Sequence, residues 1–292
     1  MGELDEVLAL VWERGPAERA GAVATGRGTL GEGWLIGHAV NGGVLMALGL
    51  RAAAEGLAAS GHTSPLSWSA HFLSAAVAGP VDVAVEVLRT GRSVSSVQVR
   101  VVQPDAGGPR GAGRDPVSTV ERVRLVATLG DVARTDPVHR APTPPTMPAP
   151  EECLPATRDA SPAAAAIRML DRLDVRIDPA TAGFAVGRPT RQGVIRAWLR
   201  MRDGREPDLA MLPFAVDALM PVSFDLGVPG WAPTLELTGQ VLGDPAPGWL
   251  LVELSTDTVV GDLLVEDAAV WDSTGRLVAR SRQLAGVRMP PA

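Results

Sequence analysis

The chain contains only one cysteine and no long apolar run, and each of these shortages excludes a class of protein. The single Cys153 rules out an intrachain disulfide framework and any metal site built from several cysteines. No stretch approaches about eighteen uncharged apolar residues, so the sequence predicts no membrane-spanning helix. The first residues are acidic, whereas a secretory signal starts basic and continues apolar. We therefore expect a cytoplasmic globular protein that needs no metal or other cofactor.

Basic residues are also in short supply. There are 27 Lys and Arg residues against 33 Asp and Glu residues, which gives a net charge of −6. Proteins that bind nucleic acid present a face rich in Lys and Arg to the phosphates, so a nucleic-acid partner is not expected. The four histidines form no pattern with Asp or Cys, and there is no Gly-x-Ser-x-Gly elbow, so a Ser–His–Asp hydrolase is not expected either.

What the sequence does contain is one structural pattern that occurs twice. In the first half Asn41-Gly42-Gly43 opens a helix predicted over 41–59, and Ser64-Pro65 opens a set of strands. In the second half a helix predicted over 208–224 precedes strands opened by Pro233-Thr234. A Pro-rich stretch separates the halves. We predict an N-terminal unit over 1–132, a linker over 133–165 and a C-terminal unit over 166–292.

Period-two alternation of apolar and polar residues predicts the strands. An antiparallel sheet needs its apolar face covered, and it can wrap around a helix that is apolar on nearly every side. Each half is therefore predicted to be an α+β unit with one long central helix. The main predicted strands are 65–73, 81–88, 94–102, 117–129, 193–200, 234–242, 249–255, 263–271 and 277–287.

The sharpest difference between the two halves is Asp217, which lies among the apolar residues 214–220 of the second predicted helix. A carboxylate in such surroundings is unfavourable unless it is paired or hydrogen-bonded, and burial would raise its pKa toward the range of a general base. The alternative is that Asp217 lies on a solvent-facing stripe or caps a neighbouring turn. If the two units face each other, Asp217 lies on a site between them.

The chain resembles the double hot-dog acyl-CoA thioesterases of type II, the TesB-like group, over nearly its whole length. The residues that carry this resemblance are Asn41-Gly42-Gly43, 67–73 with Gly79-Pro80, 88–93, Asp217, 233–237 and 271–283. The resemblance implies a hot-dog fold in each half. It also implies hydrolysis of acyl thioesters without a covalent acyl-enzyme, with an acyl-CoA or acyl-carrier thioester as substrate.

The resemblance also implies the site. Its Asp–Thr–Gln trio, which activates a water, falls on Asp217, Thr234 and Gln283. Thr238, predicted further along the same strand and on the same face as Thr234, is the alternative hydroxyl. The N–H groups of Gly42 and Gly43 would face the developing oxyanion. The other expected substrate-binding residues are Asn41, Ser69, which stands where the family often carries His, and Arg92, which could meet the phosphates of coenzyme A.

Three other functions stay open at this point. A hot-dog hydratase acting on enoyl thioesters commonly pairs Asp with a His on the same helix, but no His follows His139. A non-catalytic acyl-thioester binder would use Asp217 structurally. A thioesterase could instead act on acyl groups bound to a carrier protein. The sequence does not give acyl-chain length, and it is compatible with a homo-oligomer formed through sheet edges.

Overall fold

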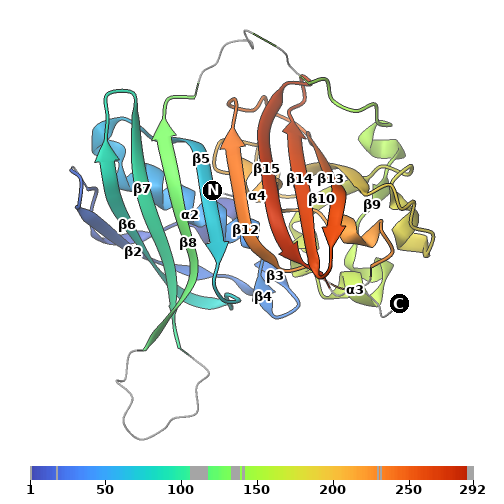
Figure 1. Cartoon of the computed structure of the whole chain (residues 1–292), viewed down its shortest axis with the longest axis horizontal. Helices are drawn as coiled ribbons and strands as arrows, with labels where there is room; N and C mark the ends of the chain where they lie inside the picture. Colours follow the sequence, from blue (N-terminus) through green and yellow to red (C-terminus); the bar gives the residue numbers. More distant parts are fainter. Residues whose placement is uncertain are drawn as a thin grey trace, which may run out of the picture.

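The computed structural model of the chain describes residues 2–17, 19–105, 118–132, 139, 142–228, 230 and 232–287. Within these residues one antiparallel sheet of thirteen strands runs through the whole molecule (Figure 1). From edge to edge its strands are β1 (Val11–Arg14), β2 (Val23–Leu30), β6 (Gly79–Thr90), β7 (Val94–Pro104), β8 (Thr119–Gly130), β5 (Ser64–Phe72), β12 (Thr234–Val241), β15 (Leu277–Gly286), β14 (Leu263–Trp271), β13 (Leu250–Val260), β11 (Val194–Met201), β10 (Leu173–Ile177) and β9 (Leu154–Pro155).

The two halves of this sheet repeat one strand order. Counted outward from the centre, the first half runs β5, β8, β7, β6, β2, β1, and the second runs β12, β15, β14, β13, β11, β10. The halves meet where β5 pairs antiparallel with β12, with Ser69 opposite Thr238, at the middle of Figure 1. This arrangement confirms the predicted α+β double hot-dog fold.

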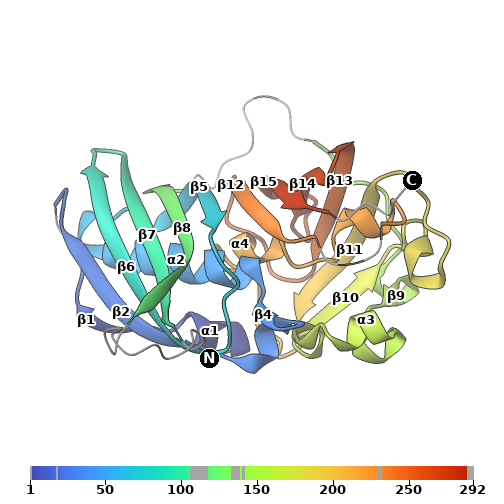
Figure 2. The same cartoon turned by 60° about the horizontal axis from the view of Figure 1, so that its bottom comes forward.

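The long central helix of the first unit, α2 (Gly42–Gly56), begins where the sequence predicts. Asn41 is its N-cap, because the Asn41 side-chain oxygen accepts a hydrogen bond of 3.1 Å from the N–H of Val44. Most of the helix is buried, and it packs on the inner face of β6, β7 and β8 (Figure 2). A helix that is apolar all round requires cover of this kind.

The prediction of a second long helix over 208–224 is wrong. The α-helix there, α4 (Leu212–Ala215), has four residues, and six residues separate it from a 3-10 turn, η7 (Val222–Phe224). Pro213 is tolerated in the first turn of α4, but Pro221 has no N–H to donate and disfavours helical backbone in the residue before it. Pro221 limits a helix only from residue 220 on, whereas α4 already ends at Ala215, so Asp217 lies in the turn between α4 and η7 and not inside a helix.

The described part of the predicted linker lies against the second unit. The indole N–H of Trp271 donates to the carbonyl of Pro142 at 3.2 Å, and that of Trp198 donates to the carbonyl of Pro148 at 2.9 Å. After residue 150 the chain contributes β9, which pairs with β10, and the short helix α3 (Pro162–Ala165). The unit boundaries stay predictions; residues 133–138, 140 and 141 lie outside the described residues.

Three smaller elements lie outside the large sheet: helix α1 (Glu3–Leu8) and a two-stranded sheet of β3 (Leu35–Ile36) and β4 (Ala39–Val40). β4 leads directly into Asn41 and the start of α2, which contact Asp217. No helix in the described ranges is both long and apolar enough to cross a membrane.

Candidate active site

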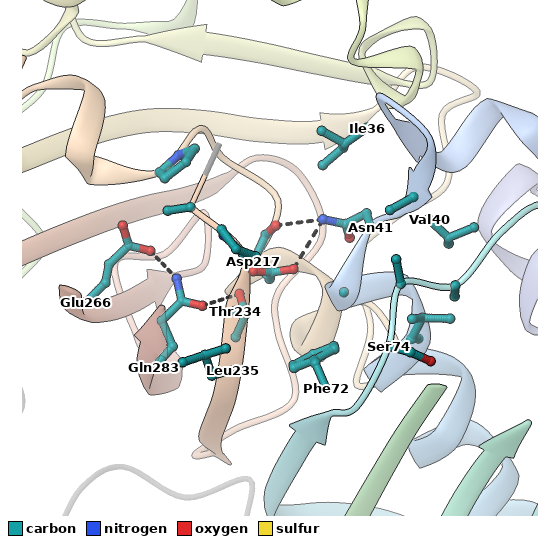
Figure 3. Close-up of a pocket in the computed structure, with 18 of the residues that line it drawn as sticks. Ile36, Val40, Asn41, Phe72, Ser74, Asp217, Thr234, Leu235, Glu266 and Gln283 are labelled. Atoms are coloured by element: carbon teal, nitrogen blue, oxygen red, sulfur yellow. Dashed lines mark hydrogen bonds between the residues drawn. The ribbon is translucent and has the colours of Figure 1, made fainter. Parts of the chain in front are cut away.

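The first unit holds the carboxylate of Asp217, although Asp217 belongs to the second unit. The backbone N–H of Gly43 donates to Asp217 Oδ2 at 2.7 Å. The Asn41 side-chain amide donates to the same oxygen at 3.2 Å, as Figure 3 shows. Asn41 also donates to the main-chain oxygen of Asp217 at 3.0 Å. The first turn of α2 carries unsatisfied N–H groups and the positive end of the helix dipole, so it favours a carboxylate at this place.

Gly42 and Gly43 permit this close approach. A Cβ added to Gly43 would lie 2.9 Å from the carbonyl oxygen of Phe214, and a Cβ added to Gly42 would lie 2.9 Å from the ring of Phe72. The N–H of Gly43 does not face an oxyanion as predicted, because Asp217 accepts its hydrogen bond. Gly42 lines the cavity described next, and Asn41 does so as well.

A cavity of about 270 Å³ lies between the two units, with Asp217 partly exposed to it. Its polar walls are Asn41 and Ser74 from the first unit and Asp217, Thr234, Glu266 and Gln283 from the second (Figure 3). The rest of its lining is largely apolar: Ile36, Ala39, Val40, Leu45, Phe72, Leu73, Ala75, Ala76, Leu219, Pro221, Ala232, Pro233, Leu235 and Leu254, with Gly42.

Burial raises the pKa of Asp217 from 3.8 to about 7, even though the hydrogen bonds from Gly43 and Asn41 act in the opposite direction. Burial disfavours the charged form of a carboxyl, and hydrogen bonds to that form favour it. A carboxylate with a pKa near neutrality can accept a proton from water in a transition state and is still ionised in part at pH 7.

A chain of hydrogen bonds faces Asp217 from the opposite wall. The Thr234 hydroxyl donates to Gln283 Oε1 at 2.7 Å, Gln283 Nε2 donates to Glu266 Oε1 at 2.5 Å, and the N–H of Val222 donates to Glu266 Oε2 at 2.7 Å. A carboxylate accepts at both oxygens, so Glu266 fixes which end of the Gln283 amide faces Thr234. The Thr234 hydroxyl proton then points to Gln283, and its lone pair is left to accept a hydrogen bond.

Sequence reasoning missed Glu266. It lies on β14, where Leu264, Ala268 and Val270 point to the core, and Glu266 occupies the same buried face. The sequence signal that could have identified it is a Glu at a position that the period-two pattern assigns to the buried face of the strand. Burial raises its pKa to about 7, and the nearby charge of Asp217 acts in the same direction, against hydrogen bonds from Val222 and Gln283.

A β-bulge places Thr234 and Thr238 on opposite faces of β12. The pairing of β12 with β15 sets Thr238 opposite Arg282 and Leu237 opposite Gln283, but its register shifts between Thr234 and Glu236. The shift turns Thr234 to the inner face, and Thr238 stays on the outer face, where it donates to Glu236 at 2.7 Å. The prediction that both threonines share one face is therefore wrong, because regular alternation ignores the bulge.

Two predicted substrate-binding residues lie elsewhere. Ser69 points to the outer face of the sheet and donates to Glu236 at 2.8 Å, whereas its neighbours Trp68 and Ala70 point inward. Arg92 is exposed in the turn between β6 and β7. Neither residue lines the cavity. Strand alternation places Ser69 on the outer face, and the hairpin that carries Arg92 ends away from the seam between the units (Figure 1).

Comparison with known proteins agrees with this fold. A model of the acyl-CoA thioesterase N-terminal domain matches residues 30–129, and one of the acyl-CoA thioesterase C-terminal domain matches residues 150–287. An uncharacterised protein of Mycobacterium tuberculosis is 33% identical over 269 residues, which cover 89% of this chain and 90% of that protein.

Solved structures give the same picture. A protein of Thermobifida fusca, named as a candidate thioesterase II, is 31% identical with a TM-score of 0.80, covering 99% of this chain and 98% of its own. The acyl-CoA thioesterase II TesB2 of Mycobacterium marinum, at 17% identity, shares the fold with a TM-score of 0.65 and 98% coverage of both chains. The chain therefore belongs to the acyl-CoA thioesterase family, and it has the double hot-dog fold.

Proposed function

We propose that this protein hydrolyses acyl-CoA to a free acid and coenzyme A by direct attack of a water. The observation that carries this proposal is the cavity between the units, where Asp217 faces the fixed hydroxyl and amide of Thr234 and Gln283. One wall offers a proton acceptor with a pKa near 7, and the other offers a hydroxyl lone pair. Together they can hold one water by both of its protons.

In the proposed reaction the water donates one proton to Asp217 and the other hydrogen bond to Thr234. As Asp217 takes the proton, the water oxygen forms a bond to the thioester carbon, and the carbonyl electrons move to the carbonyl oxygen. The N–H of Gly42, in the first turn of α2, has no acceptor inside the helix, so it can donate a hydrogen bond to this oxyanion. The carbonyl then re-forms, the carbon–sulfur bond breaks, and the thiolate leaves and takes up the proton from Asp217.

A thiol-release assay over acyl-CoA esters from two to sixteen carbons tests the proposal. We expect thiol release with at least part of this series and a one-to-one yield of free acid. Binding of acyl-CoA without thiol release at every chain length would contradict hydrolysis and favour a non-catalytic binder. Matched esters on an acyl-carrier protein, measured in parallel, distinguish an enzyme that prefers carrier-bound substrates.

The cavity argues against the hydratase alternative. That chemistry commonly pairs an Asp with a His, and none of the described residues that line the cavity is a histidine. His71, on β5, is opposite Glu236 in the sheet pairing and is exposed. Across the cavity from Asp217, the side chains of Thr234 and Gln283 can orient a water but cannot exchange protons near neutral pH. The one titratable group described on that wall is the carboxyl of Glu266, which accepts a hydrogen bond from Gln283.

The Thr234 hydroxyl is expected to contribute through its lone pair. Thr234→Val removes the oxygen and keeps the shape, so we expect kcat to fall by about tenfold to a hundredfold, at the lower end of what such catalytic contacts contribute. Thr234→Ser keeps the oxygen and should retain most of the activity. Thr238→Val, on the outer face of the same strand, is the matched control and should leave kcat unchanged. Equal losses in Thr234→Val and Thr238→Val would contradict the assignment.

A further inference from the structure

Arg122, near the start of β8, lies half-buried at the edge of the cavity that contains Asp217. Its Nε donates to Gln103 Oε1 at 3.1 Å, and its Nη1 donates to the Ser74 hydroxyl at 3.2 Å. Ser74 lines the cavity, and in Figure 3 it lies on the side away from Gln283. Both partners of Arg122 are uncharged, so these contacts leave its positive charge without compensation.

Within the described ranges no carboxylate forms an ion pair with Arg122, and this sets it apart from the other arginines there. Each of those either pairs with a carboxylate or is exposed to solvent. Taking a charge out of water is unfavourable unless a group of opposite charge compensates it. The guanidinium also has more N–H donors than its two contacts use. Arg122 is therefore suited to an anion that comes from a ligand.

The cavity reaches the surface beside Arg122. The residues of its lining that are exposed are Leu73, Ala75, Pro233 and Leu235. The N–H of Leu73 donates to the carbonyl oxygen of Arg122 at 2.9 Å, so Arg122 adjoins the first-unit side of this opening. At about 270 Å³ the cavity is smaller than pockets that enclose drug-sized ligands, and coenzyme A is larger than those ligands. The phosphate-bearing end of a thioester bound at Asp217 therefore lies outside the opening.

We propose that Arg122 binds the phosphate at the end of the phosphopantetheine arm while the thioester lies at Asp217. This inference rests on the proposed thioesterase function and adds the group by which the substrate is recognised. The planar guanidinium presents a fork of N–H groups that matches two phosphate oxygens. Gln103 and Ser74 hold this fork in place, which reduces the side-chain freedom lost on binding. The arm carries this phosphate both in coenzyme A and on an acyl-carrier protein.

Thioesters with and without the phosphate test the proposal, with an acyl group that the protein hydrolyses as its coenzyme A ester. For Arg122→Gln we expect kcat/KM of the coenzyme A ester to fall by about tenfold, the loss of a charge-assisted contact. The value for the matching pantetheine ester, which has no phosphate, should stay within about twofold of wild type. Arg122→Lys keeps the charge and should lose less for the coenzyme A ester.

Arg124→Gln is the matched control for these kinetics. Arg124 lies on the same strand, is exposed and pairs with Glu121, so its loss should leave both values near wild type. A loss of the same factor for both esters in Arg122→Gln would show that Arg122 only supports the cavity wall. That result, or an unchanged value for both esters, would overturn the phosphate assignment.

Binding measured without turnover separates this inference from the proposed function. Titration calorimetry in an Asp217→Asn background uses 4′-phosphopantetheine and pantetheine as probes. The phosphorylated probe should bind about tenfold more tightly, and Arg122→Gln should abolish that difference. If no thioester is hydrolysed but this difference is present and is lost in Arg122→Gln, the function fails and the phosphate assignment stands. The same affinity of both probes in the presence of Arg122 would overturn the assignment.

Two further esters distinguish the sources of the phosphate. The dephospho-coenzyme A ester lacks the ribose phosphate and keeps the phosphate of the arm, so Arg122→Gln should lower its kcat/KM by the same factor as for coenzyme A. A loss of that factor with the acyl-carrier protein ester as well would support both sources, and a loss with the coenzyme A esters alone would support coenzyme A. No loss with the dephospho-coenzyme A ester would place Arg122 at the ribose phosphate and overturn the assignment.

Discussion

Replacing Asp217 by Asn is expected to lower kcat for acyl-CoA hydrolysis by about a thousandfold, within the range that a general base contributes. Asn keeps the shape of the side chain, and its oxygen can still accept from Gly43 and Asn41, so the seam between the units should stay intact. What disappears is the proton acceptor. KM should change little, because the substituted group contacts the water and not the acyl or pantetheine arm.

Thermal unfolding of the same variant gives a second readout. The folded-state pKa of Asp217, about 7, lies above its unfolded value of 3.8. Between pH 3.8 and pH 7 the folded protein binds more protons at Asp217 than the unfolded chain does. The free energy of unfolding therefore falls as pH rises through this range, and it stays lower above pH 7. Asp217→Asn removes the penalty, and its Tm should exceed that of wild type at pH 8. Full activity, or a Tm below wild type at pH 8, would contradict a buried catalytic carboxylate.

Replacing Glu266 by Gln should have the second largest effect, a fall in kcat of about a hundredfold. Glu266 accepts hydrogen bonds from Val222 and Gln283 with its two oxygens. An amide offers one acceptor and one donor, so Gln at this position leaves the Val222 N–H unpaired or turns the Gln283 amide around. A turned Gln283 would donate to Thr234, and the Thr234 hydroxyl would then point its proton into the cavity.

A double-mutant cycle tells this positioning role from a general loss of structure. If Glu266 acts through Gln283 and Thr234, then Glu266→Gln should cost little further activity in a Thr234→Val background. If the fold losses in kcat of the two single variants multiply in the double variant, Glu266 does not act through Thr234. Glu253→Gln is the surface control: Glu253 lies on the neighbouring strand β13 and pairs with Arg196 on the outer face, so its loss should leave kcat near wild type.

Much of this arrangement could be predicted from local sequence. The buried helix α2 follows from its apolar faces and the capping Asn41, and the strands of both units follow from alternation. Asp217 could be singled out because a carboxylate among apolar residues is unfavourable unless it is paired or hydrogen-bonded. The assignments of Thr234 and Gln283 came from family resemblance, and the structure places these two side chains in contact.

The remainder depends on backbone details that no periodic pattern carries. The bulge that turns Thr234 inward is a one-residue shift in strand pairing, and Pro221 limits a helix that composition alone extends. The bond from Gly43 to Asp217 joins residues 174 positions apart, so only the docked units reveal that this N–H is already used. The role of Glu266 becomes apparent only from the hydrogen bond that Gln283, on the neighbouring strand, donates to it.

The pH dependence of kcat/KM for wild-type protein and for Asp217→Asn tests most directly whether an ionised Asp217 drives the reaction. The pKa of about 7 predicts that the wild-type value rises with pH, by about tenfold per unit well below the midpoint, and levels off above pH 7 to 8. The rise should be much weaker in the residual activity of Asp217→Asn, because Glu266, whose pKa burial also raises to about 7, is then the only titratable group among the described residues that line the cavity. A wild-type profile that is flat between pH 5 and 8, or an unchanged rise in the variant, would contradict the account.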